Sequence, residues 1–454
     1  MQKILSIPKS IWNVIDKNPE LKKIVANMNW LFLDKIIQMA VAFFVGIWVI
    51  RYLGPEQYGS LSYAMAFVAL FGVIAKLGMD NIAIREFIKR PKEKDEIFGT
   101  LLLLKFFSGI ITFIVSLTTV FFIKSGDFMI FWLTFIIALG FIFQISDVFD
   151  FWFQSRVQSK YAVYVRSGVN ILSGLIKIIL ILVGASLAAF AWVLLFGSIA
   201  TLFGMVVALF FSDKKIPKFK INPSIGKNIL RDSWPLILSG IAVTIYMRID
   251  QVMIGSMLNN QLLGSYSAAV ALSEAWYLVP ITIVGSVFPA IIYAKKISKS
   301  LYLRRLQLLY DFMLWGSVIV AIPVSFFSND IIFILFGQEY VQAGPVLAIY
   351  IWAGVAVSLN FTSGKFLIVE NLTEVAFYRA FAGAVINIIL NLFLIPIYGI
   401  VGSALATLIS YSVSTLAILC FKDSKINAKM FAYALNPFKF FKRSYYIEAF
   451  VIKK

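Results

Sequence analysis

Charged side chains inside long apolar stretches are the residues of this sequence that could do chemistry. Arg248 and Asp250 lie near the middle of Trp234–Leu258, an apolar stretch of about 25 residues that is long enough to cross the ~30 Å hydrocarbon layer of a membrane. Residues two apart on a helix point about 200° away from each other, so these two charges cannot share one face. A full charge inside a membrane span is costly unless it faces protein or water. At least one of them is therefore expected to meet either a neighbouring helix, as a structural ion pair, or a polar cavity.

A second group of polar residues follows one face of a predicted helix. Arg166, Asn170, Ser173 and Lys177 are spaced four, three and four residues apart, which aligns them along one apolar stretch. Such a stripe favours a wet, cation-lined surface, although Arg166 alone could be an interface anchor and Lys177 could extend toward the headgroups. Three more cations lie inside apolar stretches: Lys365, Lys105 and Lys35. The last two are close to predicted cytoplasmic ends, so their side chains are expected to extend to the membrane surface.

Carboxylates that could balance these cations or carry a proton occur in three of the apolar stretches. Glu274 follows Gly264 by ten residues, which places it about 15 Å into the bilayer at a rise of about 1.5 Å per residue. It could neutralise Arg248 or take up a proton, and Asp250 is a second candidate for ion coupling. Asp147 is a third candidate, but its position toward a cytoplasmic end also fits a residue that marks the membrane boundary.

The composition excludes a nucleic-acid binder and most enzyme classes. Hydrophobic residues make up 60% of the 454 residues and charged residues only 14%, whereas a soluble domain carries about a quarter charged residues. One cysteine, Cys420, and no histidine exclude an intramolecular disulfide, a cysteine or histidine zinc site and a histidine-activated nucleophile. No Walker A pattern occurs. We therefore expect no catalytic residue, no metal and no other cofactor.

Twelve apolar stretches are long enough to cross a membrane, so the sequence predicts an all-α polytopic membrane protein. They lie at approximately 30–53, 60–78, 97–123, 128–150, 161–183, 186–211, 233–258, 264–293, 307–327, 343–369, 376–397 and 400–421. Lysine and arginine, among them Lys218 and Arg379, are concentrated in alternate connections. Because positive residues stay on the cytoplasmic side, both termini are expected to be cytoplasmic. The +18 formal charge thus follows membrane topology.

The two halves of the chain carry similar motifs. Gly59–Ala64 (GSLSYA) matches Gly264–Ala269 (GSYSAA), and Gly184–Ala189 (GASLAA) resembles Gly402–Thr407 (GSALAT). Six spans per half give both halves one orientation, which predicts two six-helix lobes related by a parallel repeat. Small residues at span starts could also be simple packing contacts. The predicted organisation in chain order is an amphipathic cytoplasmic lead-in (1–29), a first lobe (30–211), a basic cytoplasmic linker (212–232), a second lobe (233–421) and a basic cytoplasmic tail (422–454).

Five short motifs occur in order along the predicted spans. They are RYLGPEQYG at Arg51–Gly59, GMD at Gly78–Asp80 with Arg85 following, RIDQVMIG at Arg248–Gly255, FGQEY at Phe336–Tyr340 and YGIVGSALA at Tyr398–Ala406. Together they resemble the polysaccharide-transporter family, the Wzx-type flippases of the multidrug/oligosaccharidyl-lipid/polysaccharide exporter superfamily, over the range from about Asn29 to Cys420. The resemblance implies two lobes around a central cavity that opens alternately to the two sides of the membrane.

The resemblance also implies a substrate. It is an undecaprenyl-diphosphate-linked oligosaccharide, moved from the inner to the outer leaflet of a bacterial or archaeal cytoplasmic membrane for a surface polysaccharide such as O-antigen or capsule. The implied partners are this lipid-linked oligosaccharide, membrane lipids, a polysaccharide polymerase and glycosyltransferases. The residues expected to line the cavity and hold the diphosphate are Arg248, Lys177, Arg166 and Lys365. The residues expected to couple transport to an ion gradient are Glu274, Asp250 and Asp147.

Two other interpretations remain open on sequence alone. A multidrug/ion antiporter of the related exporter branch would bind organic cations and would have a net negative cavity with aromatic residues. The cations found inside the apolar stretches at least equal the acids in number, which disfavours this interpretation. A membrane protein without transport activity would not need a polar helical stripe such as that from Arg166 to Lys177.

Overall fold

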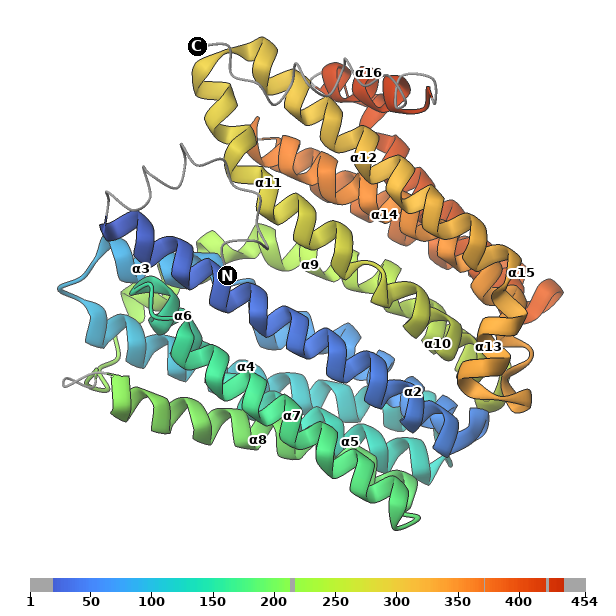
Figure 1. Ribbon diagram of the computed structural model, residues 1–454. Coiled ribbons are helices and arrows are strands. Elements are labelled where there is room, and N and C mark those ends of the chain that lie inside the picture. The colour runs from blue at the N-terminus through green and yellow to red at the C-terminus, as the bar shows by residue number, and fades with distance from the viewer. Residues whose placement is uncertain (1–18, 213–216, 371, 422–423, 437–454) are drawn as a thin grey trace. The chain divides into compact units, whose positions relative to one another are not determined.

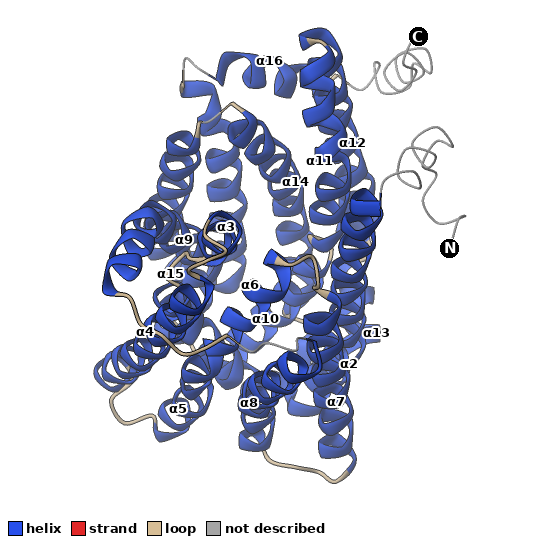
Figure 2. Ribbon diagram, turned by 90° about the vertical axis from the view of Figure 1, so that its left-hand side faces the viewer, coloured by secondary structure: helices blue, strands red, loops and turns tan. Residues whose placement is uncertain are grey.

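The computed structural model describes residues 19–212, 217–370, 372–421 and 424–436. Within these ranges every regular element is a helix (Figure 2). The expected all-α class is therefore confirmed. The first part of the predicted lead-in and most of the predicted C-terminal tail lie outside the described residues.

The helices are labelled in Figure 1 in chain order. They are α2 (Pro19–Lys76), α3 (Asp80–Lys89), α4 (Lys94–Ile123), α5 (Phe128–Phe143), η1 (Gln144–Ser146), α6 (Asp147–Ser155), α7 (Lys160–Leu182), α8 (Leu187–Ser212), α9 (Pro223–Met257), α10 (Asn260–Ala275), α11 (Leu278–Ile297), α12 (Lys299–Phe326), α13 (Ser328–Phe336), η2 (Gln338–Tyr340), α14 (Ala343–Val369), α15 (Thr373–Leu416), η3 (Ala417–Cys420) and α16 (Lys425–Ala434).

Ten helical segments among the described residues are long and apolar enough to cross a membrane. Two of them are far longer than the ~20 residues that one crossing needs: Asn29–Lys89 has 61 residues and Glu374–Cys420 has 47. Each contains a glycine in the left-handed region, Gly54 at φ 68° and Gly399 at φ 59°. A residue with a side chain rarely adopts this conformation, so glycine permits the sharp turn there. Both breaks fall where the sequence predicts the end of one span and the start of the next.

The chain divides into two compact units, each built from separate parts of the sequence. Unit 1 comprises Met1–Val45, Ile74–Val115 and Phe135–Trp234, and unit 2 comprises Gly46–Val73, Ser116–Thr134 and Pro235–Lys454. The lobe boundaries that the sequence predicts, 30–211 and 233–421, stay a prediction.

The core of unit 1 gathers around Trp152 on α6. This side chain is 1% exposed and stands edge-to-face against Phe87 of α3 and Phe98 of α4, with ring centroids 5.4 and 5.7 Å away. The guanidinium of Arg156 lies 3.9 Å from the same ring centroid. The amphipathic helix α3 thus packs its apolar face against α6.

Unit 2 is organised around α14, which contacts α10, α11, α12, α13 and α15. Figure 1 shows α12 and α14 running side by side in yellow and orange. Six tyrosine side chains are buried in its main core: Tyr63, Tyr266, Tyr277, Tyr340, Tyr350 and Tyr411. A core with this many phenol groups carries polar atoms that need partners.

Part of the predicted linker is helical, because α9 begins at Pro223. Asn222 accounts for this start: its side-chain oxygen accepts from the backbone N–H groups of Ser224 and Ile225 at 3.1 and 3.4 Å. Its side-chain nitrogen donates to Glu96 at 2.6 Å, and its backbone N–H donates to Thr100 at 2.9 Å. The segment before α9 is therefore fastened to α4 within unit 1.

Candidate functional site

Arg248 on α9 and Glu274 on α10 form an ion pair inside unit 2. The Nη2 atom of Arg248 lies 3.0 Å from Oε2 of Glu274, and the two side chains are 30% and 18% exposed. Neutralising Arg248 was one of the two roles that the sequence suggested for Glu274. The other carboxylate oxygen, Oε1, is buried and has no partner among the described residues. Glu274 can therefore still accept a proton or a hydrogen bond.

Several polar atoms near this ion pair are buried without a partner. The hydroxyls of Tyr277, Tyr350 and Tyr411 and the indole nitrogen of Trp276 make no hydrogen bond in the described part of the chain. Trp276 and Tyr277 follow Glu274 along the chain by two and three positions, and the ring of Tyr411 packs against that of Tyr246, two positions before Arg248. Buried polar groups in proteins are nearly always satisfied, so a cluster of unsatisfied ones indicates water or a ligand that the chain itself does not supply.

The aromatic part of this site was missed by the sequence reasoning, which treated charged residues only. Tyr246 and Tyr411 stand edge-to-face with centroids 5.0 Å apart, although they come from α9 and α15. A signal was available: a tyrosine inside an apolar span is out of place, since tyrosine usually lies at the membrane interface. We name this group of residues, Arg248, Glu274, Trp276, Tyr277, Tyr350 and Tyr411, the central site of unit 2.

Asp250 lies on the same helix as Arg248 but belongs to a different polar cluster. Its side chain is 0% exposed, and its Oδ2 atom accepts from the hydroxyls of Tyr266 at 2.5 Å and Thr407 at 3.4 Å. No cationic side chain pairs with this carboxylate among the described residues. The expectation that Arg248 and Asp250 face different surroundings agrees with these contacts.

The cluster continues from Thr407 through amide and hydroxyl groups of α15. Asn387 donates to Thr407 at 3.5 Å, Asn391 donates to Asn387 at 3.0 Å, and Ser403 donates to Asn391 at 2.7 Å. All four side chains are fully buried. An unpaired carboxylate at the end of a buried chain of oxygen and amide groups is suited to exchange a proton or bind a small cation.

Arg166 in unit 1 is held by two carboxylates. Its Nε atom lies 3.0 Å from Asp34 and its Nη1 atom 2.5 Å from Asp150, and Ser167 also donates to Asp34, at 3.1 Å. Asp34 is 1% exposed and was missed by the sequence reasoning, although a carboxylate inside the first apolar stretch was visible there. The predicted stripe is therefore not purely cationic at this end, because the group around Arg166 carries one more negative charge than positive.

Asp147 pairs with Lys105, whose Nζ atom lies 2.8 Å from it. Lys105 is 0% exposed, so the expectation that this side chain extends to the membrane surface was wrong. The reason is that the carboxylate of Asp147, 42 positions further along the chain, satisfies the ammonium inside unit 1.

Lys177 and Lys365 are the two predicted site cations without a carboxylate partner among the described residues. Lys365 lies over the ring of Phe288, 4.8 Å from its centroid. Lys177 is half-buried, and no charged side chain pairs with it in the described part of the chain. The four predicted cations thus divide into two that are paired with carboxylates and two that are free to meet an anion.

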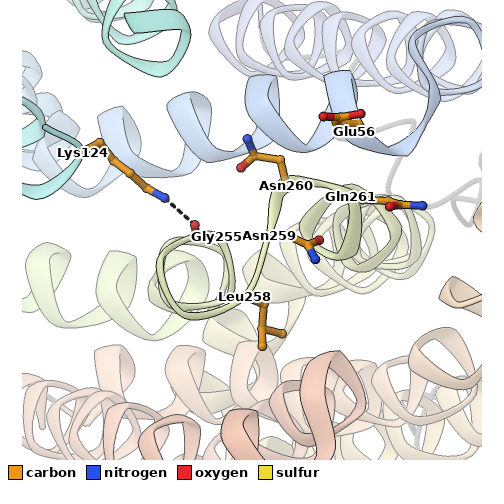
Figure 3. A pocket seen from close by; sticks show the side chains of 7 residues that line it. All are labelled: Glu56, Lys124, Gly255, Leu258, Asn259, Asn260 and Gln261. Atoms are coloured by element: carbon orange, nitrogen blue, oxygen red, sulfur yellow. Dashed lines mark hydrogen bonds between the residues drawn. The ribbon is translucent and has the colours of Figure 1, made fainter. Parts of the chain in front are cut away.

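Unit 2 also contains a polar pocket of about 440 Å³ at the turn between α9 and α10 (Figure 3). It is lined by Glu56, Lys124, Gly255, Leu258, Asn259, Asn260 and Gln261. Lys124 donates to the carbonyl oxygen of Gly255 at 2.6 Å and lies 4.8 Å from the ring centroid of Tyr63. Partial burial lowers the pKa of this lysine.

Comparison with known proteins agrees with this architecture. The profile of the family described as "Polysaccharide biosynthesis protein" matches residues 24–294. Among curated proteins, the chain is 27% identical over 232 residues to the probable low-salt glycan biosynthesis flippase Agl15 of Haloferax volcanii, which is 50% of this chain and 48% of that protein. It is also 27% identical over 257 residues to the probable flippase AglR of the same organism, 54% of this chain and 52% of that protein. The match spans about half the length of these two relatives.

A longer match and two solved structures extend the comparison. An uncharacterized membrane protein of Methanocaldococcus jannaschii is 27% identical over 399 residues, 82% of this chain and 91% of that protein. The fold resembles the inward closed lipid II flippase MurJ with a TM-score of 0.66 at 16% identity, covering 94% of both chains. It resembles an inward-facing multidrug resistance MATE transporter with a TM-score of 0.64 at 15% identity, covering 88% of this chain and 96% of that one. At these identities the likeness concerns the fold alone.

Proposed function

Because the chain belongs to the polysaccharide biosynthesis protein family, a family of transporters and flippases rather than enzymes, we propose that it flips an undecaprenyl-diphosphate-linked oligosaccharide across the cytoplasmic membrane. The direction is from the inner to the outer leaflet, and the product serves a surface polysaccharide. Two relatives are named as flippases, one of them for glycan biosynthesis, and this supports the substrate class.

The observation that carries the proposal is the central site of unit 2. A diphosphate-sugar headgroup cannot enter hydrocarbon unaided, because burying unpaired charge and unsatisfied hydroxyls is prohibitively costly. The central site offers one cation, one carboxylate and several phenol and indole groups that have no partner among the described residues. Tyrosine hydroxyls and a tryptophan N–H can replace the water around sugar hydroxyls, and a guanidinium can hold a phosphate through two parallel hydrogen bonds.

Glu274 decides when Arg248 is free for phosphate in this mechanism. With Glu274 ionised, the guanidinium is engaged at 3.0 Å, so an incoming diphosphate has to compete with the carboxylate. Protonation of Glu274, or its turning away, releases Arg248. Lys365 in unit 2 and Lys177 in unit 1, which have no carboxylate partner among the described residues, are further cations available to an anion.

Ion coupling in the proposed mechanism centres on Asp250. This carboxylate is buried, has no cationic partner among the described residues and shares α9 with Arg248. Binding of a proton or a sodium ion at Asp250 would change the packing between α9, α10 and α15, which meet there through Tyr266 and Thr407. Asp147 is less suited because Lys105 already neutralises it.

The proposed architecture is twelve spans in two six-helix lobes, 30–211 and 233–421, with both termini and the basic linker cytoplasmic. The glycine breaks in the two longest helices support twelve crossings. A matched pair of contacts in unit 2 supports a repeat: Tyr340 donates to the carbonyl oxygen of Ile50, and Lys124 donates to that of Gly255, both at 2.6 Å. The two acceptors are 205 positions apart, the same spacing as between the motifs that begin at Gly59 and Gly264.

The test is the lipid-linked intermediate itself. Cells that lack the protein should accumulate an oligosaccharide linked to a polyprenyl diphosphate, identified by mass spectrometry of extracted lipids, and should lose the surface polymer. Wild-type protein should reverse both effects, and Arg248→Ala at equal membrane abundance should not. A deletion strain with a normal lipid-linked pool and normal polymer would contradict the proposal.

The second candidate function is a multidrug/ion antiporter, and one observation favours it. Glu274 has a free oxygen next to buried aromatic rings, an arrangement that also suits an organic cation through charge and cation–π contacts. Export of a fluorescent organic cation, dependent on Glu274 and unaffected by loss of the polysaccharide pathway, would support this function instead.

A further inference from the structure

Arg379 is a buried cation that neither the sequence analysis nor the proposed mechanism uses. The sequence counts it among the positive residues that mark cytoplasmic connections. The structure places it within α15, six positions after Thr373, the first residue of that helix, with 8% of its surface exposed. A charge at this depth is costly unless it has a partner, so its surroundings need an explanation.

The partners of Arg379 in unit 2 are all neutral. Its Nη1 atom donates to the hydroxyl of Ser363, and its Nη2 atom donates to the backbone carbonyl oxygen of Asn360 at 3.3 Å. No carboxylate lies within ion-pair distance of it among the described residues. A guanidinium has five N–H donors, and only two of them have acceptors among the described residues. The other deep arginines, Arg248 and Arg166, both have carboxylate partners.

The groups around Arg379 suggest an unfilled place for an acceptor. The side-chain oxygen of Asn360 and the side-chain nitrogen of Asn427 are buried and have no partner in the described part of the chain. The hydroxyl of Tyr310 donates to Asn427, and the same hydroxyl also interacts with Ser363, the residue to which Arg379 donates. Asp311, next to Tyr310, does not serve as a counterion for Arg379. Its carboxylate accepts a hydrogen bond from Gln307 at 2.8 Å and forms no ion pair with Arg379.

Gly364 keeps the space beside the guanidinium open. A Cβ atom built on this glycine would meet only Nη2 of Arg379, at 3.6 Å, which is an ordinary contact distance. A methyl group would therefore fit there, but a larger side chain would occupy the space next to the unused donors. Gly364 thus offers a way to block the site without removing its charge.

We propose that Arg379, Ser363 and Asn427 form a binding site for a phosphate-ester anion that shares no residue with the central site of unit 2. Ser363, whose hydroxyl donates to the carbonyl oxygen of Asn360 at 3.1 Å, orients the guanidinium. A phosphate provides the several acceptor oxygens that the guanidinium donors and the amide N–H of Asn427 require. The predicted topology puts this end of α15 near the cytoplasmic surface. Two sources of the anion are available there: the phosphate of an anionic membrane lipid, or the diphosphate of the substrate on arrival. The second source rests on the proposed function.

The test measures binding to the full-length protein in detergent with two probes. Farnesyl diphosphate, a soluble polyprenyl diphosphate, is titrated while the melting temperature is followed, and retained phosphatidylglycerol is counted by native mass spectrometry. The variants are Arg379→Gln, which removes the charge, and Gly364→Leu, which fills the space. The matched control is Arg304→Gln, which removes an exposed arginine of α12 in the same unit.

Each outcome decides the question. If the substrate is the source, both site variants lose a charge-assisted phosphate contact. Their half-saturating farnesyl diphosphate concentration should then rise about tenfold or more, while that of the control stays unchanged. If a lipid is the source, the site variants should retain less phosphatidylglycerol and farnesyl diphosphate should shift none of the proteins. Wild-type behaviour of both site variants with both probes would overturn the proposal.

The binding test does not depend on one variant or on the export assay. Should Arg379→Gln fail to fold, Gly364→Leu and Ser363→Ala take its place in the same measurements, since neither removes a charge. These are binding measurements, so a failure here leaves the export assay of the proposed function untouched, and a failed export assay would leave the lipid outcome standing.

Discussion

Gly59 on α2 and Gly264 on α10 lie at a close contact between the two helix backbones in unit 2, which leaves no room for a side chain at either position. A Cβ atom on Gly59 would come within 1.7 Å of the carbonyl oxygen of Asn260, and one on Gly264 within 1.8 Å of that of Pro55. The contact is reciprocal, because residues 59 and 264 and residues 55 and 260 are both 205 positions apart. Self-complementary contacts of this kind arise about a two-fold axis. They are what a repeat of the two motifs would produce.

Replacing Gly59 by alanine should therefore destabilise the protein. The added methyl group would collide with backbone, which cannot rotate away as a side chain can, and overpacking of this kind typically costs about 1–3 kcal/mol. We expect a lower melting temperature in detergent for Gly59→Ala, and the same for Gly264→Ala. Gly46→Ala is the matched control, since it lies on the same helix with nothing within 4 Å of the added atom. Equal melting temperatures for all three would contradict the close packing.

Much of the fold could be predicted from sequence because membrane spans are encoded locally. An apolar stretch of about 20 residues must be helical to satisfy its backbone in lipid, so the spans around Arg248 and Arg166 were recognisable without any knowledge of their neighbours. The boundary between the first two spans, where Gly54 lies, was visible for the same reason, because the first apolar stretch ends there. Long-range pairing was not visible: nothing local indicates that Arg166 meets Asp34, which lies 132 positions earlier.

In the candidate site, too, contacts between neighbouring helices could be predicted and long-range contacts could not. Glu274 could be named as a partner of Arg248 because α9 and α10 are consecutive helices. Lys105 was misjudged, since its distance from the span end suggested a route to the surface while its carboxylate partner came from another helix. The buried tyrosines were missed because phenol groups count as apolar in a hydropathy analysis, although each carries a hydroxyl that must be satisfied or left free for a ligand.

Lys124 gives a prediction about pH. Its folded-state pKa is lowered by partial burial, while in the unfolded chain a lysine titrates near about 10.4. Between these two values the unfolded state binds more protons, so the free energy of unfolding should rise with pH. The melting temperature of the wild type minus that of Lys124→Gln should therefore increase as the pH is raised from neutral toward about 10. A difference that stays flat or falls would contradict the lowered pKa.

Asp250 should carry the response to ions. Asp250→Asn keeps the hydrogen-bonding shape next to Tyr266 but removes the charge. In the wild type, we expect the melting temperature to depend on sodium chloride measured against choline chloride, or on pH, and this dependence should disappear in Asp250→Asn together with export. Asp147→Asn is the comparison, because Lys105 neutralises that carboxylate. Loss of the ion response in Asp147→Asn alone would move the coupling site to unit 1.

The linker offers a check on topology. In a background of Cys420→Ser, which removes the exposed native thiol, a cysteine at Lys218 should not react with a membrane-impermeant maleimide in intact cells. It should react after the membrane is opened, because the basic linker is predicted to be cytoplasmic. Labelling in intact cells would contradict both the predicted topology and the parallel orientation of the proposed lobes.

The pair Arg248 and Glu274 provides the sharpest test of phosphate binding. If Arg248 holds the diphosphate, Arg248→Lys should reduce export substantially, because an ammonium cannot supply two parallel, coplanar hydrogen bonds. Arg248→Ala should nearly abolish export while the protein still inserts in the membrane. If the guanidinium only neutralises Glu274, Arg248→Lys should be mild.

The double variant separates these roles. Arg248→Gln with Glu274→Gln removes both charges, so no uncompensated charge is left at this pair and the stability lost in either single variant should be largely recovered. We expect export, normalised to the amount of protein in the membrane, to remain lost even when stability recovers, since this pair no longer offers a cation to the diphosphate. Export that recovers together with stability would show that Arg248 serves the fold and that the phosphate must be bound elsewhere, with Lys177 and Lys365 the next residues to test.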